Sequence, residues 1–160
     1  MLNPIDTAAV IRDGGATGTA PDQIHAGVAW WLGACLVVTR GASRAVVGDD
    51  GHPISTEYAA RFARGATNAG HYRCHTTVVI GPVDEQTLLD FRADEQAVAA
   101  YIRTREDATV TITLYDVAGE VLTERNGLAR IRALIAEDRV PIPVNKAARG
   151  TLDEREADAP

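Results

Sequence analysis

Lysine is nearly absent from this sequence, and long apolar runs are absent altogether. Lys146 is the only lysine, so the positive charge comes from arginines spread along the chain, and the formal net charge is -6. Because nucleic-acid phosphates require clustered Lys and Arg side chains, we expect no nucleic-acid partner. No stretch approaches the roughly 18 consecutive apolar residues of a membrane span, so we expect no membrane partner either.

The sequence also has only two cysteines and lacks the pattern of a secretory signal. The first 13 residues lack the basic start and the apolar run of a secretory signal, which predicts a cytoplasmic protein. Cys35 and Cys74 lie far apart in the sequence. We therefore expect free, mostly buried thiols and no disulfide framework.

The length and composition of the chain limit the number of domains. With 160 residues, of which 46% are hydrophobic, the chain suffices for one core and is too short for two substantial ones. We divide it into an N-terminal extension (residues 1–10), one domain (residues 11–143) and a charged tail (residues 144–160) that we expect to be disordered.

Predicted helices and strands alternate along the domain. Apolar residues at helical spacing predict helices that start at Asp22, at Ser55 or Thr56, at Asp84 and at Thr123. Strands are predicted over residues 44–47, 72–80 and 110–114, a loop over residues 12–21, and either a strand or a helix over residues 97–102. This alternation predicts a layered α/β domain with helices on both faces of its sheet.

Two segments carry a resemblance to a known family. Residues 46–53 read Val-Val-Gly-Asp-Asp-Gly-His-Pro before a predicted helix, and residues 113–123 read Thr-Leu-Tyr-Asp-Val-Ala-Gly-Glu-Val-Leu-Thr. Both resemble segments of the phosphohexomutases, the phosphomannomutases and phosphoglucomutases, as do the shorter Thr17-Gly18 and Gly81-Pro82 pairs. The resemblance covers domain I of that family only. It implies a three-layer α/β/α domain with a mixed sheet.

The resemblance also implies where a site would lie. In the family a serine carries the phosphoryl group, and Thr104 occupies that position, so Thr104 is the catalytic candidate. The implied ligand-binding residues are those of the matching loops and the two arginines beside Thr104, namely Thr17, Gly18, Asp50, Gly51, Arg103 and Arg105.

Several positions depart from the family's pattern. Thr17, Asp49 and His52 stand where the family usually has arginines, which removes positive charge that would favour a phosphorylated side chain. The Asp-Gly-Asp loop with which the family holds magnesium is missing from this sequence. We therefore expect no cofactor, and magnesium only in an assembly with a partner that supplies the metal loop.

These observations leave three functions open. The first is a domain I-like protein that lacks mutase activity by itself and acts as a regulatory or interaction module. Its partner would be a second copy or another protein that covers the face left by the missing domains. The second is a subunit of a split phosphomannomutase or phosphoglucomutase of carbohydrate metabolism, with phosphate on Thr104. The third is a binder of a phosphosugar or another anion through Thr17, Asp50 and Thr104.

Three other motifs have plainer interpretations. Residues 71–75 carry two histidines and Cys74, but alternation on a strand would place Cys74 on the face opposite both histidines. The acidic turn over residues 49–52 fits a solvated capping turn better than a cation site. The glycine-rich residues 14–19 lack the Gly-Lys-Ser/Thr ending of a phosphate-binding loop. We therefore predict no metal site and a flexible connection over residues 14–19.

Overall fold

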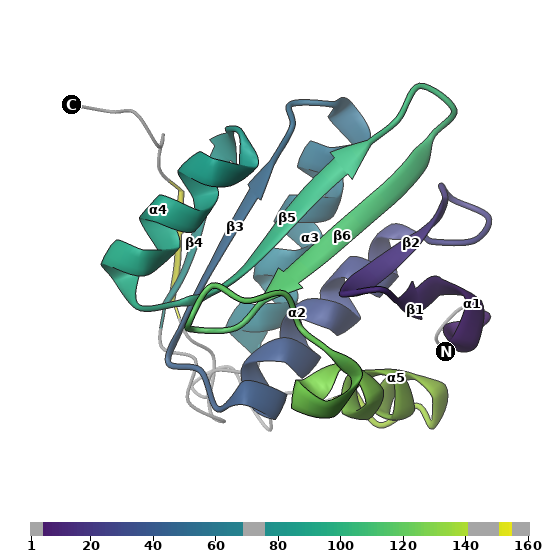
Figure 1. Ribbon diagram of the computed structural model, residues 1–160. Coiled ribbons are helices and arrows are strands. Elements are labelled where there is room, and N and C mark those ends of the chain that lie inside the picture. Colours follow the sequence, from purple (N-terminus) through teal and green to yellow (C-terminus); the bar gives the residue numbers. More distant parts are fainter. Residues whose placement is uncertain (1–4, 69–75, 141–150, 155–160) are drawn as a thin grey trace.

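The computed structural model describes residues 5–68, 76–140 and 151–154 of the chain. In this described part, seven strands form one sheet in the order β1-β2-β6-β5-β3-β4-β7 (Figure 1). The strands are β1 (Ile11–Arg12), β2 (Gly15–Thr19), β3 (Arg44–Asp49), β4 (Thr76–Pro82), β5 (Val98–Thr104), β6 (Thr109–Tyr115) and β7 (Thr151–Glu154). The helices are α1 (Thr7–Val10), α2 (Ala26–Arg40), α3 (Pro53–Asn68), α4 (Glu85–Glu95) and α5 (Ala129–Ala136), with the π-helix η2 (Glu124–Leu128) leading into α5.

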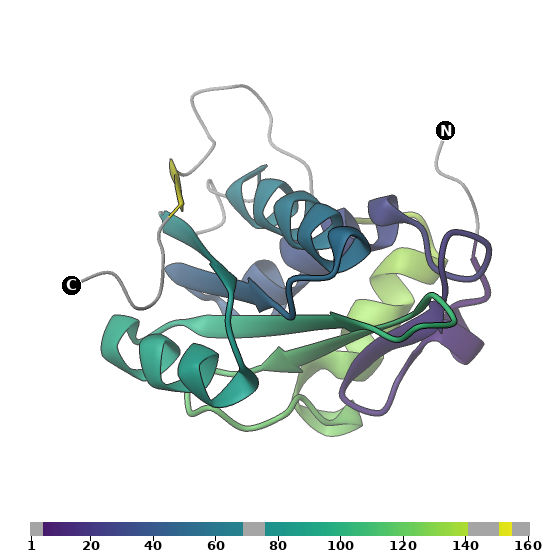
Figure 2. The same cartoon turned by 90° about the horizontal axis from the view of Figure 1, so that it is seen from above.

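Helices cover both faces of this sheet (Figure 2). Strands β3, β4, β5 and β7 pair in parallel, whereas β1, β2 and β6 join them through antiparallel pairing. Helices α2, α3 and α5 contribute to one core cluster, and α4 packs on β3 and β5 from the other face. The predicted three-layer α/β/α domain with a mixed sheet is confirmed.

The helix starts at Asp84 and Thr123 agree with their predicted caps. The Asp84 side chain accepts a hydrogen bond from the Thr87 amide at 2.7 Å and begins α4. The Thr123 hydroxyl accepts one from the Asn126 amide and begins η2. The ambiguous residues 97–102 fall mostly in β5, which pairs with β3 on one side and β6 on the other, so neighbouring strands hold its backbone extended.

The prediction of a loop over residues 12–21 is wrong. Residues 15–19 form β2, which pairs with β6 along its whole length. Gly14 has a φ of 88° in the turn between β1 and β2, whereas Gly15 serves close packing of the strands. A β-carbon on Gly15 would collide with the carbonyl oxygen of Ile112, so only glycine allows the two strands to approach so closely.

Two helices begin at residues other than those predicted. Helix α2 begins at Ala26, because His25 caps it by accepting a hydrogen bond from the Gly27 amide at 3.1 Å. Helix α3 begins at Pro53, a residue whose fixed φ and missing N–H suit the first helical position. Ser55, one of the two predicted caps, therefore lies inside α3 and is buried. None of the described helices is long and apolar enough to cross a membrane.

Residues near both ends of the chain join the fold. Within the expected extension, residues 7–10 form α1, and Val10 joins the main core cluster. Within the expected disordered tail, residues 151–154 form β7, which corrects that expectation for these four residues. The physical reason is that β7 pairs with the outer edge of β4, whose backbone would otherwise lack a partner strand.

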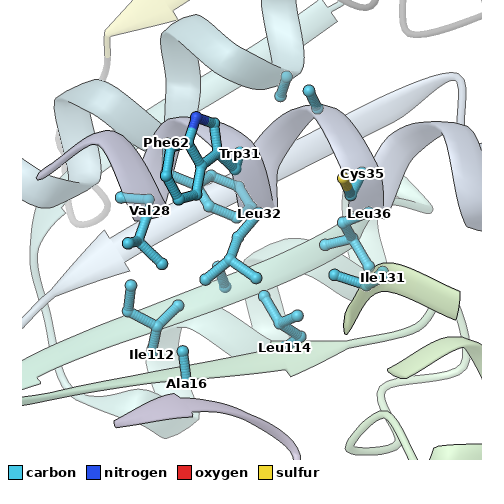
Figure 3. Packing of buried hydrophobic residues seen from close by; sticks show 14 of the residues in the cluster. Ala16, Val28, Trp31, Leu32, Cys35, Leu36, Phe62, Ile112, Leu114 and Ile131 are labelled. Carbon is cyan, nitrogen blue, oxygen red and sulfur yellow. The ribbon is translucent and has the colours of Figure 1, made fainter. Parts of the chain in front are cut away.

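The core lies between α2 and the sheet (Figure 3). Val28 and Leu32 of α2 lie above Ile112 of β6, and Leu36 lies beside Ile131 of α5. Cys35 is fully buried in the same cluster, and burial raises the pKa of its thiol to about 12. This thiol is therefore protonated at neutral pH and acts as a small apolar side chain.

Helices α2 and α3 cross with their backbones in direct contact. A β-carbon on Gly33 of α2 would collide with the carbonyl oxygen of Phe62, and one on Gly65 of α3 would collide with the carbonyl oxygen of Trp30. Both glycines are buried and helical, where they cost stability relative to alanine unless packing requires them. The close crossing therefore depends on the absence of side chains at Gly33 and Gly65.

We predict that Gly33→Ala or Gly65→Ala lowers the free energy of unfolding by about 3 kcal/mol, because the two helices must separate to admit the methyl group. Urea denaturation followed by circular dichroism measures this. Gly41→Ala is the matched control, since Gly41 has φ of 59° and no atom near its missing β-carbon. It should cost only about 1 kcal/mol. Equal losses in all three variants would contradict the contact.

Candidate functional site

The matching segment over residues 46–53 and the candidate Thr104 meet where β3 and β5 end, whereas the matching segment over residues 113–123 lies at the other end of β5. The two strands are parallel neighbours, with Asp49 beside Ile102, so the residues that follow them come together at one edge of the sheet. The Thr104 amide donates to Oδ2 of Asp50 at 2.9 Å, and the Asp50 amide donates to the Ile102 carbonyl at 3.1 Å. We call Asp49, Asp50, Ser55 and Thr104 the strand-end site.

Asp50 organises the turn after β3. Its Oδ1 accepts a hydrogen bond from the His52 amide at 3.0 Å, while Oδ2 holds the Thr104 amide. Partial burial raises the pKa of Asp50, but the hydrogen bonds from Thr104, His52 and the Ser55 hydroxyl together outweigh it and bring the pKa below its ordinary value. Asp50 is therefore a carboxylate fixed at the end of β5.

The Thr104 hydroxyl is turned into the protein. Thr104 is only 8% exposed, and its Oγ1 lies 2.6 Å from Oγ of Ser55, which is fully buried in α3. The Thr104 and Ser55 hydroxyls share a hydrogen bond in which either can be the donor, and a side-chain hydrogen bond from Ser55 contributes to the lowered pKa of Asp50. Thr104, Ser55 and Asp50 thus belong to one hydrogen-bonded cluster.

Asp49 is more buried than the sequence predicts. The sequence indicates a solvated turn, but Asp49 is only 1% exposed. Its Oδ1 accepts hydrogen bonds from the Gly51 amide at 2.8 Å and from the Thr56 hydroxyl at 3.1 Å. Its Oδ2 has no hydrogen-bond partner among the described residues. Asp49 therefore ties the turn to the first turn of α3 and places a carboxyl group beneath that helix.

The two arginines beside Thr104 do not join the strand-end site. Alternation along β5 places Arg103 on the opposite face of the sheet from Thr104. There the Arg103 guanidinium pairs with Glu85 at 2.8 Å and lies 5.2 Å from the ring centre of Tyr101. Arg105 is exposed in the turn that follows β5, where its amide donates to the Thr109 carbonyl at 2.9 Å. Neither guanidinium donates a hydrogen bond to Thr104.

Glu85 also binds a tyrosine on that face. The Tyr115 hydroxyl donates to Oε2 of Glu85, and burial together with this carboxylate raises the pKa of Tyr115 above its ordinary value. The sequence analysis missed Glu85 and Tyr115, because α4 and β6 lie far apart in the chain and no local motif joins them. For Ser55, the sequence predicted only the role of a helix cap. A serine that closely follows an acidic turn was the only sign in the sequence of its contact with Thr104.

Thr17 and Gly18 lie on β2, away from the strand-end site. Thr17 shares the Arg103 face of the sheet, and its hydroxyl lies 3.3 Å from that of Thr111. A pocket of about 490 Å³ adjoins both residues. It is lined by Ile5, Asp6, Ala9, Val10, Arg12, Thr17, Gly18, Thr19, Asp22, Gln23 and Thr109. One arginine and two aspartates give this lining a net negative charge.

The sequence also contains motifs that could bind a cation or a phosphate, and the structure locates some of them. In the described residues, no three side chains of His, Cys, Asp or Glu gather in a way that could hold a metal ion. The motif over residues 71–75 lies outside the described residues. The glycine-rich residues 14–19 form the end of a turn and β2, and α2 begins only at Ala26, so they do not lead directly into a helix N-terminus.

Two solved structures have a similar fold. The chain matches a phosphoglucomutase/phosphomannomutase family protein from Burkholderia thailandensis with a TM-score of 0.75 and 14% identity, over 96% of this chain and 34% of that one. It matches a protein from Thermus thermophilus, described as a phosphomannomutase, with a TM-score of 0.67 and 18% identity, over 98% of this chain and 34% of that one. No protein-family model and no curated protein matches the chain.

These comparisons establish the fold. The chain has the fold of one domain of phosphoglucomutase/phosphomannomutase family proteins and spans about a third of the length of either structure. At such low identity they carry no residue roles across. The activity of those longer proteins is therefore a separate question.

We predict that the stabilising effect of Asp50 disappears in acid. Because the folded pKa of Asp50 is depressed, its carboxylate stabilises the fold above its ordinary pKa of 3.8, and this contribution is lost as the pH falls through the folded value. Asp50→Asn should lower the free energy of unfolding by about 1 kcal/mol at pH 7, since the side chain is largely exposed.

The difference between wild type and Asp50→Asn should then shrink towards pH 3, as measured by urea denaturation at several pH values. Asp94→Asn is the control, because it removes an exposed carboxylate of α4 outside the strand-end site. A difference that stays constant between pH 7 and pH 3 would contradict the assigned role of Asp50.

Proposed function

We propose that this domain is an interaction module that does not itself accept a phosphoryl group. The observation that carries the proposal is the position of Thr104. Its hydroxyl is 8% exposed and lies 2.6 Å from the buried Ser55 hydroxyl. An acceptor of a phosphoryl group must present its oxygen in line with the phosphorus of the donor, and a buried oxygen that faces another hydroxyl cannot do so without moving the end of β5.

The charges near Thr104 support the same proposal. A phosphorylated side chain brings nearly two negative charges, which require cations or several donors around them. Here Asp50 binds the amide of Thr104 itself, and Asp49 lies buried under the first turn of α3. Of the two arginines adjacent to Thr104, Arg103 is paired with Glu85 on the opposite face of the sheet, and Arg105 is exposed in the turn that follows β5. Phosphate on Thr104 would therefore lie close to the Asp50 carboxylate.

A binding role is compatible with the fold because fold and activity are separable. In the similar structures, this domain accounts for about a third of the chain. A domain that keeps the three layers but closes the acceptor position can still bind other protein chains. We therefore propose that the partner is a protein, either a second copy of this chain or a different one.

The split-enzyme function predicts phosphate on Thr104 once a partner supplies the metal loop, and the first test of the proposal asks whether the chain takes up phosphate by itself. The chain is incubated with magnesium and a hexose 1,6-bisphosphate, and mass spectrometry of its peptides is used to search for phosphate. We expect none on Thr104, and no conversion between hexose 1-phosphate and hexose 6-phosphate.

Two variants serve as controls in that experiment. Thr104→Val removes the hydroxyl at the acceptor position, whereas Thr111→Val removes a half-buried hydroxyl from the other face of the sheet. Phosphate on Thr104, or turnover that Thr104→Val abolishes and Thr111→Val retains, would refute the proposal and favour the subunit of a split mutase.

A further inference from the structure

The start of α3 is held by the ring of His52. The Ile54 amide donates a hydrogen bond to Nδ1 of His52 at 3.1 Å. The Thr56 amide donates to the His52 carbonyl at 2.9 Å, which places His52 in the N-cap position of the helix. The imidazole therefore does for α3 what the side chain of a serine or an aspartate does in many helices, because it satisfies an amide of the first turn.

This cap requires a neutral imidazole. A ring nitrogen that accepts a hydrogen bond carries no proton, so the proton of neutral His52 is on Nε2. Protonation makes both ring nitrogens donors, and Nδ1 would then face the Ile54 amide as one donor against another. The positive charge would also lie at the N-terminus of α3, where the helix dipole favours negative charge. Adding a proton to His52 therefore breaks the cap.

The charged groups on the elements that meet at His52 are mostly acidic. Asp49 and Asp50 belong to the same turn, Glu57 lies further along α3, and Arg105 follows the end of β5. Asp50 accepts the His52 amide on Oδ1 at 3.0 Å, and Oδ2 of Asp49 has no hydrogen-bond partner among the described residues. The ionised Asp50 attracts a positively charged ring. The ring thus has two alternatives, the amide of the first turn when it is neutral and the acidic turn when it is charged.

The first turn of α3 also carries the contact that buries Thr104. Ser55 directly follows Ile54, and its hydroxyl lies 2.6 Å from the Thr104 hydroxyl. Ser55 can hold Thr104 only while this turn lies over the end of β5. A first turn that has lost its cap opens more often, which withdraws Ser55 and exposes the Thr104 hydroxyl.

We propose that His52 is a pH-sensitive cap, which keeps Thr104 buried while the imidazole is neutral and releases it in mild acid. Among the side-chain types in this turn, only an imidazole ordinarily changes charge between pH 5 and 8. The inference concerns regulation of the strand-end site and does not rest on the proposed function, because Thr104 is buried whatever the domain binds. Phosphate on Thr104 at neutral pH would refute the proposed function and leave the pH-sensitive cap untouched.

Thiol labelling at position 104 measures the release. The full chain with Thr104→Cys is labelled with N-ethylmaleimide at pH 7 and at pH 5, and peptide mass spectrometry separates this site from the native cysteines. Arg105→Cys is the exposed reference that corrects for the effect of pH on thiol reactivity. We expect the labelling rate of Thr104→Cys, relative to Arg105→Cys, to rise about tenfold from pH 7 to pH 5, since a side-chain cap is lost. Equal relative rates at the two pH values would overturn the inference.

Two substitutions of His52 provide matched controls. Asparagine is a strong N-cap that does not titrate, so His52→Asn should keep labelling slow at both pH values, whereas His52→Ala removes the cap and should make it fast at both. His25 caps α2 through the same ring nitrogen, so acid acts on that helix as well. The comparison among His52 variants removes the contribution of His25. The same rise in acid with His52→Asn as with His52 would overturn the pH-sensitive cap.

A measurement on the unmodified chain decides the question if Thr104→Cys itself opens the site. Hydrogen exchange followed by NMR, corrected for the intrinsic rate at each pH, gives the protection of the Ile54 amide. We expect this protection to fall about tenfold between pH 7 and pH 5, and nitrogen NMR to show the proton of His52 on Nε2 at pH 7. Constant protection, or a proton on Nδ1 at pH 7, would overturn the inference whatever the labelling shows.

Discussion

The contact between the backbones of α2 and α3 at Gly33 and Gly65 determines how the strand-end site is built. Because neither position carries a side chain, α3 lies directly on α2, and both helices pack on the same face of the sheet. This fixes the first turn of α3 over the end of β5, where Ser55 meets Thr104. A wider crossing would lift Ser55 away and leave the Thr104 hydroxyl without its buried partner. The burial of the Thr104 hydroxyl therefore depends on a helix contact that lies outside the strand-end site.

Local patterns predicted the layered α/β architecture and the caps of α4 and η2, because hydrophobic alternation and capping residues act within a few positions. They failed where glycine served packing. Gly15 indicated a loop, but it allows β2 to approach β6. They failed again at β7, whose order depends on pairing with β4 and not on its own composition. The burial of Asp49 could not be predicted either, since it depends on how α3 lies over the end of β3.

The candidate residues separate into two groups for one reason, the alternation of side chains across the sheet. Thr104 and Asp49 face α3, whereas Arg103 and Thr17 face the other side. Residues adjacent in sequence thus contribute charge to different faces. The face that holds the acceptor position has carboxylates and hydroxyls, and the arginine is neutralised by Glu85 on the far side. The proposed binding role depends on this distribution of charge within a fold shared with phosphoglucomutase/phosphomannomutase family proteins.

The proposed function depends most on the hydrogen bonds by which Asp50 and Ser55 keep Thr104 buried. Amide hydrogen exchange measured by NMR tests the hydrogen bond to Asp50 directly. The Thr104 amide donates to Oδ2 of Asp50 at 2.9 Å, although it is the last residue of β5. We predict that this amide exchanges as slowly as that of Ile102 in the middle of the strand, and faster in Asp50→Asn. Exchange of the Thr104 amide at the rate of Glu106, in the exposed turn that follows, would contradict the closed site.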